Sequence, residues 1–84
     1  MMDIEERVFE IVSEQLCTNI SKIKRESSFV SDLHADSLDV VELVMQFEDE
    51  FDIKKITDEE FNNVMTVGQA VNLIIKKKNE DKHN

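Results

Sequence analysis

A single serine hydroxyl stands among carboxylates near the middle of the chain, in the stretch DLHADSLDVVEL at residues 32–43. Asp36 precedes Ser37, and Asp39 lies three positions after Asp36, a spacing at which polar side chains cap the first turn of a helix. We therefore predict a helix that begins at Ser37. A phosphate ester on Ser37 would lie at the positive end of the helix dipole, beside unpaired backbone N–H groups. The stretch suits a bound phosphate, although Asp-Ser pairs also begin helices for capping alone.

The helix predicted over residues 37–51 has two apolar faces. At about 100° per residue, one arc gathers the side chains expected in the core, which are Val40, Leu43, Val44, Phe47 and Phe51. A second apolar group lies to one side with acids among or beside it, and it comprises Leu38, Val41 and Met45 with Glu42, Glu48 and Asp49. This group could widen the buried arc, or it could form an exposed apolar patch ringed by acids. We favour the exposed patch, which is typical of a protein-docking face.

The negative charge is concentrated in the middle of the sequence. The chain has 19 acidic and 10 basic residues, a net charge of −9. Residues 31–60 hold eleven of the acids and only two of the bases, so the remainder of the chain is balanced. Such a chain repels nucleic acid, and its localised field favours a basic protein partner.

An all-α fold is expected to position these residues, as a single domain. The 84 residues are 40% hydrophobic with no proline and one glycine, which leaves little of the turn chemistry that β-hairpins need. Apolar residues recur at helical spacing from residue 3 to residue 16, where Asp3 and Glu6 form a capping pair. Similar pairs, Thr57 with Glu60 and Thr66 with Gln69, predict a short third helix and a longer last one.

The remaining segments are a long connection and a polar end. Residues 17–36 should contain a short helical turn, and we expect five apolar side chains to tie this connection to the core, namely Ile20, Ile23, Phe29, Val30 and Leu33. Residues 76–84, KKKNEDKHN, are expected to form a frayed polar end. No apolar run is long enough to span a bilayer, so membrane insertion is not expected.

Several kinds of site can be argued against. Cys17 is alone, which excludes an intramolecular disulfide, a zinc quartet and a CxxC redox pair, and we expect it half-buried at a helix end in a protein of the reducing cytoplasm. A calcium loop starting at Asp32 would place Ser37 where glycine is needed and Leu43 where glutamate is needed, so no metal site is predicted. A hydrolase triad of Ser37, His34 and an aspartate lacks an evident pocket or oxyanion hole.

The longer stretch HADSLDVVELVMQFEDEFD resembles the prosthetic-group region of acyl carrier proteins, of the discrete kind that serves type II fatty acid synthesis. The resemblance continues through IEERVFEIVSEQL, SSFVSDL, ITDEEF and VGQAVNLI, nearly the whole chain. It implies a four-helix bundle of three longer helices and one short helix, with a long loop between the first two. It also implies an acyl carrier domain at residues 1–78, a polar tail at 79–84, and Ser37 as the attachment point of 4'-phosphopantetheine.

The resemblance further implies a role and partners. The chain would be a monomeric carrier without enzymatic activity, holding fatty acyl groups as thioesters and sheltering them between its helices. Its partners would be holo-acyl-carrier-protein synthase and fatty acid synthesis enzymes with basic patches. The predicted docking face, carried over by position, comprises Asp36, Leu38, Asp39, Val41, Glu42, Met45, Glu48 and Asp49.

Two features depart from the family pattern. His34 stands where glycine is usual, three residues before the serine. The connection FDIKKITDEE is one residue longer than usual, with Lys54 and Lys55 near the acids and Thr57 where proline is common. These departures leave the orientation of the third helix and the choice of partner open, but not the modification site. Independently of them, two alternative functions stay open: a carrier of aminoacyl or specialised acyl cargo, and an acidic helical adaptor that is never modified and leaves Ser37 without a role.

Overall fold

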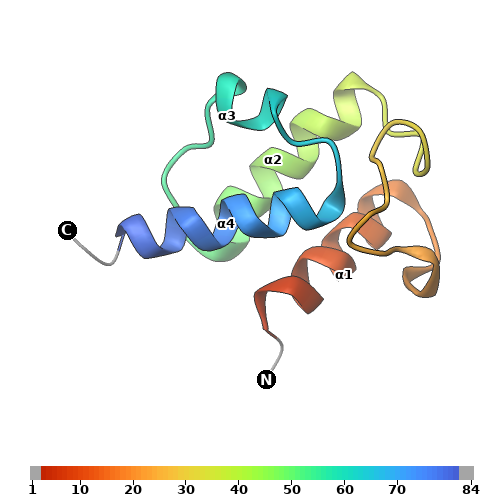
Figure 1. The fold of residues 1–84 in the computed structure, drawn as a ribbon, viewed down its shortest axis with the longest axis horizontal. Coiled ribbons are helices and arrows are strands. Elements are labelled where there is room, and N and C mark those ends of the chain that lie inside the picture. The colour runs from red at the N-terminus through yellow and green to blue at the C-terminus, as the bar shows by residue number, and fades with distance from the viewer. Residues whose placement is uncertain (1–2, 82–84) are drawn as a thin grey trace.

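The structure, a computed structural model, describes residues 3–81 and is built from helices (Figure 1). Its elements are α1 (Ile4–Leu16), the 3₁₀ turn η1 (Ile20–Lys22), α2 (Ser37–Phe51), α3 (Asp58–Asn62) and α4 (Val67–Asp81). Within residues 3–81 the only β-type pairing is an isolated bridge between Ser28 and Thr66. The predicted all-α fold with one short helix is confirmed, as are the predicted bounds of α2 and the helical turn in the long connection.

Polar side chains cap the first turns of these helices, as the sequence predicted. In α1, the backbone N–H of Glu6 donates to Asp3 Oδ1 at 2.8 Å, while Asp3 N–H donates to the Glu6 carboxylate at 3.2 Å. Thr57 and Glu60 form the same reciprocal pair in front of α3. These bonds satisfy N–H groups that have no partner inside the helix, and they fix where each helix begins.

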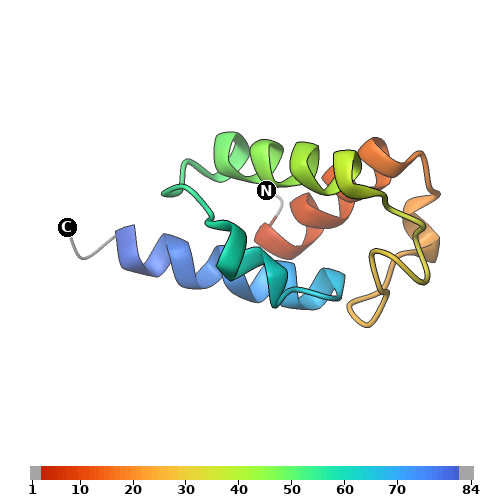
Figure 2. The same ribbon diagram turned by 90° about the horizontal axis from the view of Figure 1, so that it is seen from above.

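The core lies where α1 packs against α2 and α4. Figure 2 shows α1 between these two helices, and Figure 1 shows α3 on the side away from α1. The largest fully buried side chains come from these three helices: Val8, Ile11, Val12, Leu43, Phe47, Val67, Val71 and Ile74. Removing each from water contributes about 1.5–3 kcal/mol, so this contact dominates the stability of the bundle and fixes the helix that begins at Ser37.

The connection between α1 and α2 is bound to the beginning of α4. Gly68 N–H donates to Arg25 O at 2.8 Å, and Val67 N–H donates to Ser27 O at 3.0 Å. An alanine Cβ at position 68 would lie 3.0 Å from the Arg25 carbonyl oxygen, a tighter contact than a Cβ normally makes, so the close approach favours glycine. The long connection is therefore a tied segment of the fold.

Of the five side chains expected to tie this connection to the core, three are buried and two are not. Ile23, Phe29 and Leu33 are buried, as predicted. Ile20 is 44% exposed because it belongs to a 3₁₀ turn on the surface, and Val30 is 67% exposed because it lines a groove instead of the core. The prediction was wrong for Ile20 and Val30.

Two further expectations need correction. Cys17 is exposed, not half-buried; it is the C-cap of α1, where the helix ends with the backbone in the left-handed region (φ 52°). The polar end is not frayed from residue 76, since α4 continues to Asp81 and Lys77 is buried. Of the predicted tail at 79–84, residues 79–81 are helical and residues 82–84 lie outside the described residues, while the domain limit at residue 78 stays a prediction.

Candidate functional site

Ser37 is the first residue of α2, and its side chain is exposed. Asp36 is the N-cap: Asp39 N–H donates to Asp36 Oδ1 at 2.9 Å, and Asp36 N–H donates to Asp39 Oδ2 at 3.2 Å. The capping pair fixes the turn that presents Ser37. It leaves the N–H groups of Ser37 and Leu38 at the positive end of the helix dipole, where a phosphate oxygen can accept from them.

The backbone conformation of His34 shows how a histidine can stand where the family usually has glycine. Its backbone lies in the left-handed region with φ 58°. Glycine adopts this conformation freely, whereas a residue with a Cβ is strained there. The chain therefore keeps the backbone turn that glycine would allow, with an exposed imidazole in addition.

A groove of about 660 Å³ lies between α2 and α3, and Ser37 lines it. The apolar part of its lining comes from α2, from α3 and from the segments before them: Val30, Ala35, Val40, Val41, Val44, Met45, Ile56 and Phe61. Polar side chains lie mostly along the α3 side and near Ser37, and they include Lys55, Thr57, Asp58 and Asn62. A hydroxyl that can be esterified therefore stands on a hollow that suits an apolar chain.

The comparisons with known proteins agree with this geometry. The family described as "Phosphopantetheine attachment site" matches residues 6–74, most of the chain. The chain belongs to this family. A solved structure described as an acyl carrier protein of Mycobacterium tuberculosis is similar to it, with a TM-score of 0.82 and 31% sequence identity over 88% of this chain and 97% of that one.

This membership gives the carrier its cofactor and its general role. The chain is an acyl carrier protein, whose prosthetic group is phosphopantetheine. Proteins of this kind hold acyl cargo for partner enzymes and are not themselves enzymes. The adaptor that is never modified is therefore not supported. Ser37 fits the group by type and by place, because it is an exposed hydroxyl at a helix N-terminus beside an apolar groove.

The apolar part of the predicted docking face is exposed. The side chains of Leu38, Val41 and Met45 are 66%, 54% and 59% exposed. The wheel had left open whether these residues widen the buried arc, and their exposure decides for a surface patch. Val41 and Met45 also line the groove, so the patch and the groove are continuous.

The acids of the predicted docking face differ in their exposure and in the hydrogen bonds that they make within the protein. Glu42 accepts a hydrogen bond from Gln15 Nε2 of α1 at 3.2 Å, yet it stays exposed. Glu48 is half-buried, and its Oε2 accepts from the backbone N–H of Ile56 at 2.7 Å. Asp49 is exposed. Of these three acids, Glu42 and Asp49 are thus exposed to solvent, while Glu48 holds the segment in front of α3.

Sequence reasoning missed the lysines of α4. Lys77 is only 7% exposed; its Nζ lies 2.8 Å from Glu60 Oε1 and donates to the carbonyl oxygen of Lys55 at 3.2 Å. Lys78 Nζ donates to Phe51 O at 2.8 Å, at the C-terminal end of α2. The helical periodicity carried the signal, because residue 77 follows Ile74 by three positions and lies on the buried face. Three consecutive lysines had been interpreted as a solvated end.

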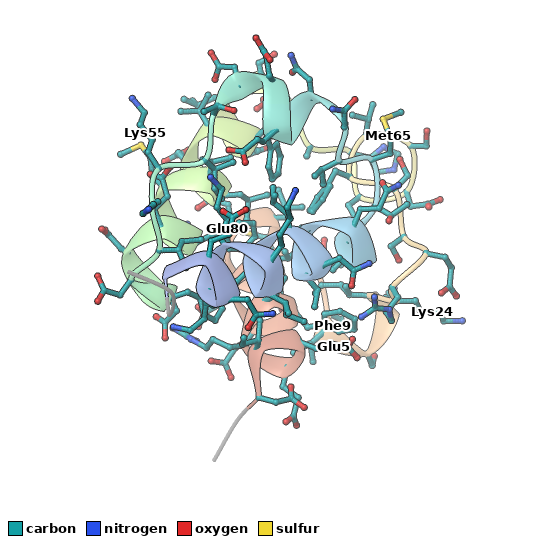
Figure 3. All side chains as sticks on the ribbon, turned by 60° about the vertical axis from the view of Figure 1, so that its left-hand side comes forward. Glu5, Phe9, Lys24, Lys55, Met65 and Glu80 are labelled. Carbon is teal, nitrogen blue, oxygen red and sulfur yellow. The ribbon has the colours of Figure 1, made fainter. Side chains whose placement is uncertain are left out.

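The surroundings of Glu60 and Lys55 complete the site. The Lys77 ammonium, with a further contribution from the Thr57 backbone N–H, holds the pKa of Glu60 below its ordinary value. Lys55 lies on the connection leading into α3, and Met65 follows α3; Figure 3 shows the two on either side of that helix.

Residues 3–81 contain no cluster of side chains suited to a metal ion, and none of their helices is both long and apolar enough to cross a membrane.

Proposed function

We propose that Ser37 is the attachment point of 4'-phosphopantetheine and that the chain carries fatty acyl groups between the enzymes of type II fatty acid synthesis. The observation that carries the proposal is the place of the Ser37 hydroxyl, exposed at the first position of α2 and lining the α2–α3 groove. The family assignment identifies the cofactor, and the place of Ser37 supports this residue as its attachment point.

The residues around Ser37 have defined roles in this proposal. The Asp36–Asp39 pair holds the turn, so the hydroxyl is presented in one orientation to the loading enzyme. The first-turn N–H groups stabilise the negative charge of the phosphodiester. When attached, the arm supplies a terminal thiol that holds the acyl group as a thioester. The valines of α2 that line the groove then shelter the apolar chain from water.

Delivery to partners follows from the docking face. Basic patches on holo-acyl-carrier-protein synthase and on the synthesis enzymes would meet the exposed acids Glu42 and Asp49, while Leu38, Val41 and Met45 supply the apolar contact. The same negative field disfavours self-association, so we propose a monomer. We place it in the cytoplasm, where an exposed thiol such as Cys17 stays reduced.

The modification experiment uses intact mass. The apo protein is incubated with coenzyme A and a phosphopantetheinyl transferase, in the wild-type form and as Ser37→Ala. Wild type should gain the mass of one arm, and Ser37→Ala should gain nothing. Ser31→Ala is the matched control, because Ser31 is also exposed and precedes the same helix, and it should load like wild type. A wild type that stays unmodified would contradict the assignment of Ser37.

The docking experiment uses charge reversal. Glu42→Lys should slow acyl transfer to a synthase with a basic patch, and raising the salt concentration should reduce the difference from wild type. Glu14→Lys on α1 makes the same charge change at an exposed position outside the docking face and should leave transfer nearly unchanged. Equal effects of the two variants would remove the docking role from α2.

A second candidate is a carrier of specialised acyl cargo. The polar lining contributed by Lys55, Thr57 and Asn62 favours it, because a hydroxylated or amino-bearing chain could be hydrogen bonded there. The lifetimes of octanoyl and hydroxyoctanoyl thioesters on the same carrier would discriminate between the two. Longer protection of the plain chain supports fatty acid synthesis, and longer protection of the hydroxylated chain supports the specialised pathway.

A further inference from the structure

The outer wall of the groove is the least supported part of the fold. α3 has five residues, too few to be stable as an isolated helix. Its single buried side chain is Phe61, which is 8% exposed and packs against Phe29 with ring centroids 6.2 Å apart. The place of this wall therefore depends on contacts made around α3 as well as on Phe61.

Lys77 of α4 makes such contacts on both sides of the α3 N-cap. Its ammonium pairs with Glu60 Oε1 at 2.8 Å, in the first turn, and donates to Lys55 O at 3.2 Å, two residues before Thr57. Glu60 Oε1 also accepts from Thr57 N–H at 2.9 Å, so one carboxylate joins the cap to the lysine. A buried ammonium requires partners in definite places, because leaving it unpaired is costly.

A hydrogen bond from α2, on the opposite side of the groove, complements the contacts of Lys77. Glu48 of α2 accepts from Ile56 N–H at 2.7 Å. The segment 55–57, which lines the groove, is therefore held by α2 through Glu48 and by α4 through Lys77. The two anchors together set the separation between α2 and the wall.

We propose that Lys77 is a positioning residue for the cargo: by holding the Lys55 carbonyl and the Glu60 carboxylate, it fixes the α3 wall and thereby the width of the groove. This inference rests on the proposed function, since it takes the groove to be the place of the acyl chain. Lys77 does not touch Ser37 in this arrangement and acts through α3. Loading of Ser37 should therefore be independent of it.

The first test uses the apo protein and needs no cargo. Lys77→Met keeps an apolar stem of similar length and removes the charge, Lys77→Arg keeps the charge, and Lys76→Met is the control at an exposed neighbouring position. Native-state amide hydrogen exchange over residues 56–64 should become about tenfold faster in Lys77→Met. The rate should return toward wild type in Lys77→Arg and stay unchanged in Lys76→Met.

The amides of the core report whether the effect is local. Those of Val8, Ile11 and Val12 in α1 should be accelerated much less than those of residues 56–64 in every variant. Unchanged exchange in residues 56–64, or equal acceleration across the whole chain, would overturn the positioning role. Glu60→Gln provides a second way to break the ion pair: its side-chain oxygen can still accept from Thr57, and it should repeat the effect of Lys77→Met.

The second test uses loaded protein and hydroxylamine cleavage of the thioester. In Lys77→Met, an octanoyl thioester should be cleaved about three times faster than in wild type, while an acetyl thioester, too short to fill the groove, should be cleaved at the same rate. Equal effects on the two chain lengths would overturn the proposal. If wild type takes up no arm, the proposed function fails, whereas the exchange experiment still decides the role of Lys77.

Discussion

The two sides of α2 differ in how closely they are packed. Towards α1 and α4, Leu43 and Phe47 are completely buried, and side chains of α1 reach across to the acids: Arg7 Nη2 lies 2.9 Å from Glu50 Oε1. Towards α3, Val40 and Val44 are only half-buried and line the groove. One helix therefore takes part in a closed core and in an open hollow.

The two sides of α2 therefore have different effects on the site: one fixes its orientation, and the other leaves space beside it. The closed side fixes the orientation of α2 and hence of Ser37, because interiors packed at crystal-like density do not deform continuously. The open side leaves room for a guest, and its wall is a short helix held by a few contacts. Mutations on the closed side should therefore change global stability strongly, and mutations on the open side should change it less and act mainly on local properties.

The largest effect is expected from paired truncations on the two sides of α2. Leu43→Ala, in the closed core, should lower the free energy of unfolding by about 2–5 kcal/mol. Val44→Ala, the adjacent residue on the groove side, should lower it by only about 1 kcal/mol, because part of the side chain is already exposed. Urea denaturation followed by circular dichroism measures both. Similar losses would mean that the groove side is packed as tightly as the core.

A smaller effect is expected at the close approach between Arg25 and α4. Gly68→Ala places a Cβ 3.0 Å from the Arg25 carbonyl oxygen, so backbone must shift and the free energy of unfolding should fall by about 1–3 kcal/mol. Lys76→Ala, at an exposed position of the same helix, should change it by less than about 0.5 kcal/mol. A Gly68→Ala variant as stable as wild type would show that the connection can move away from α4.

In the turn before Ser37, one substitution should stabilise the protein. His34→Gly relieves the left-handed strain before Ser37, and part of the gain is offset by the greater freedom of glycine in the unfolded chain. We expect a net gain of about 0.5–1 kcal/mol in the free energy of unfolding. His34→Ala is the control, since it keeps the Cβ and should give no gain. Equal thermal midpoints for the two variants would contradict the strain.

The smallest effect concerns the acid dependence of the α3 wall. The folded-state pKa of Glu60 lies below its ordinary value of 4.5, chiefly because of Lys77. The stabilisation from Glu60 is therefore fully present above that ordinary value and is lost as the pH falls through the lower, folded-state pKa. Wild type should be more stable than Glu60→Gln near neutral pH, with the difference shrinking in acid. Urea midpoints across this pH range measure it, and a constant difference would argue against the ion pair.

The local elements could be predicted from the sequence because short-range chemistry determines them. The capping pairs at Asp3, Asp36, Thr57 and Thr66 placed the start of every helix, and the apolar period placed the face that each long helix buries. The position of Ser37 also followed from these rules, whereas the wheel grouped Leu38, Val41 and Met45 and only the structure showed that they are exposed.

The parts that the sequence did not reveal depend on which segments meet in three dimensions. The pairing of Lys77 with Glu60 joins residues from different helices; the helical period places Lys77 on the buried face of α4, but it does not identify the partner that the ammonium meets. Val30 has the residue type of a core position, but in the structure it is exposed and lines the groove. Similarly, the commitment of Glu48 to Ile56 N–H could not be read from a helical wheel, which shows a side but not its neighbours.

The turn in front of Ser37 is completed by residues that are synthesised late. Ala35 N–H donates to Phe29 O, and Phe29 N–H donates in turn to Met65 O, while Arg25 meets Gly68 across a separation of 43 positions. A nascent chain that has not yet reached Met65 lacks these contacts, and their long separation in the sequence adds an entropic cost of loop closure. The Ser37 hydroxyl is therefore held in this turn only after translation has passed Gly68.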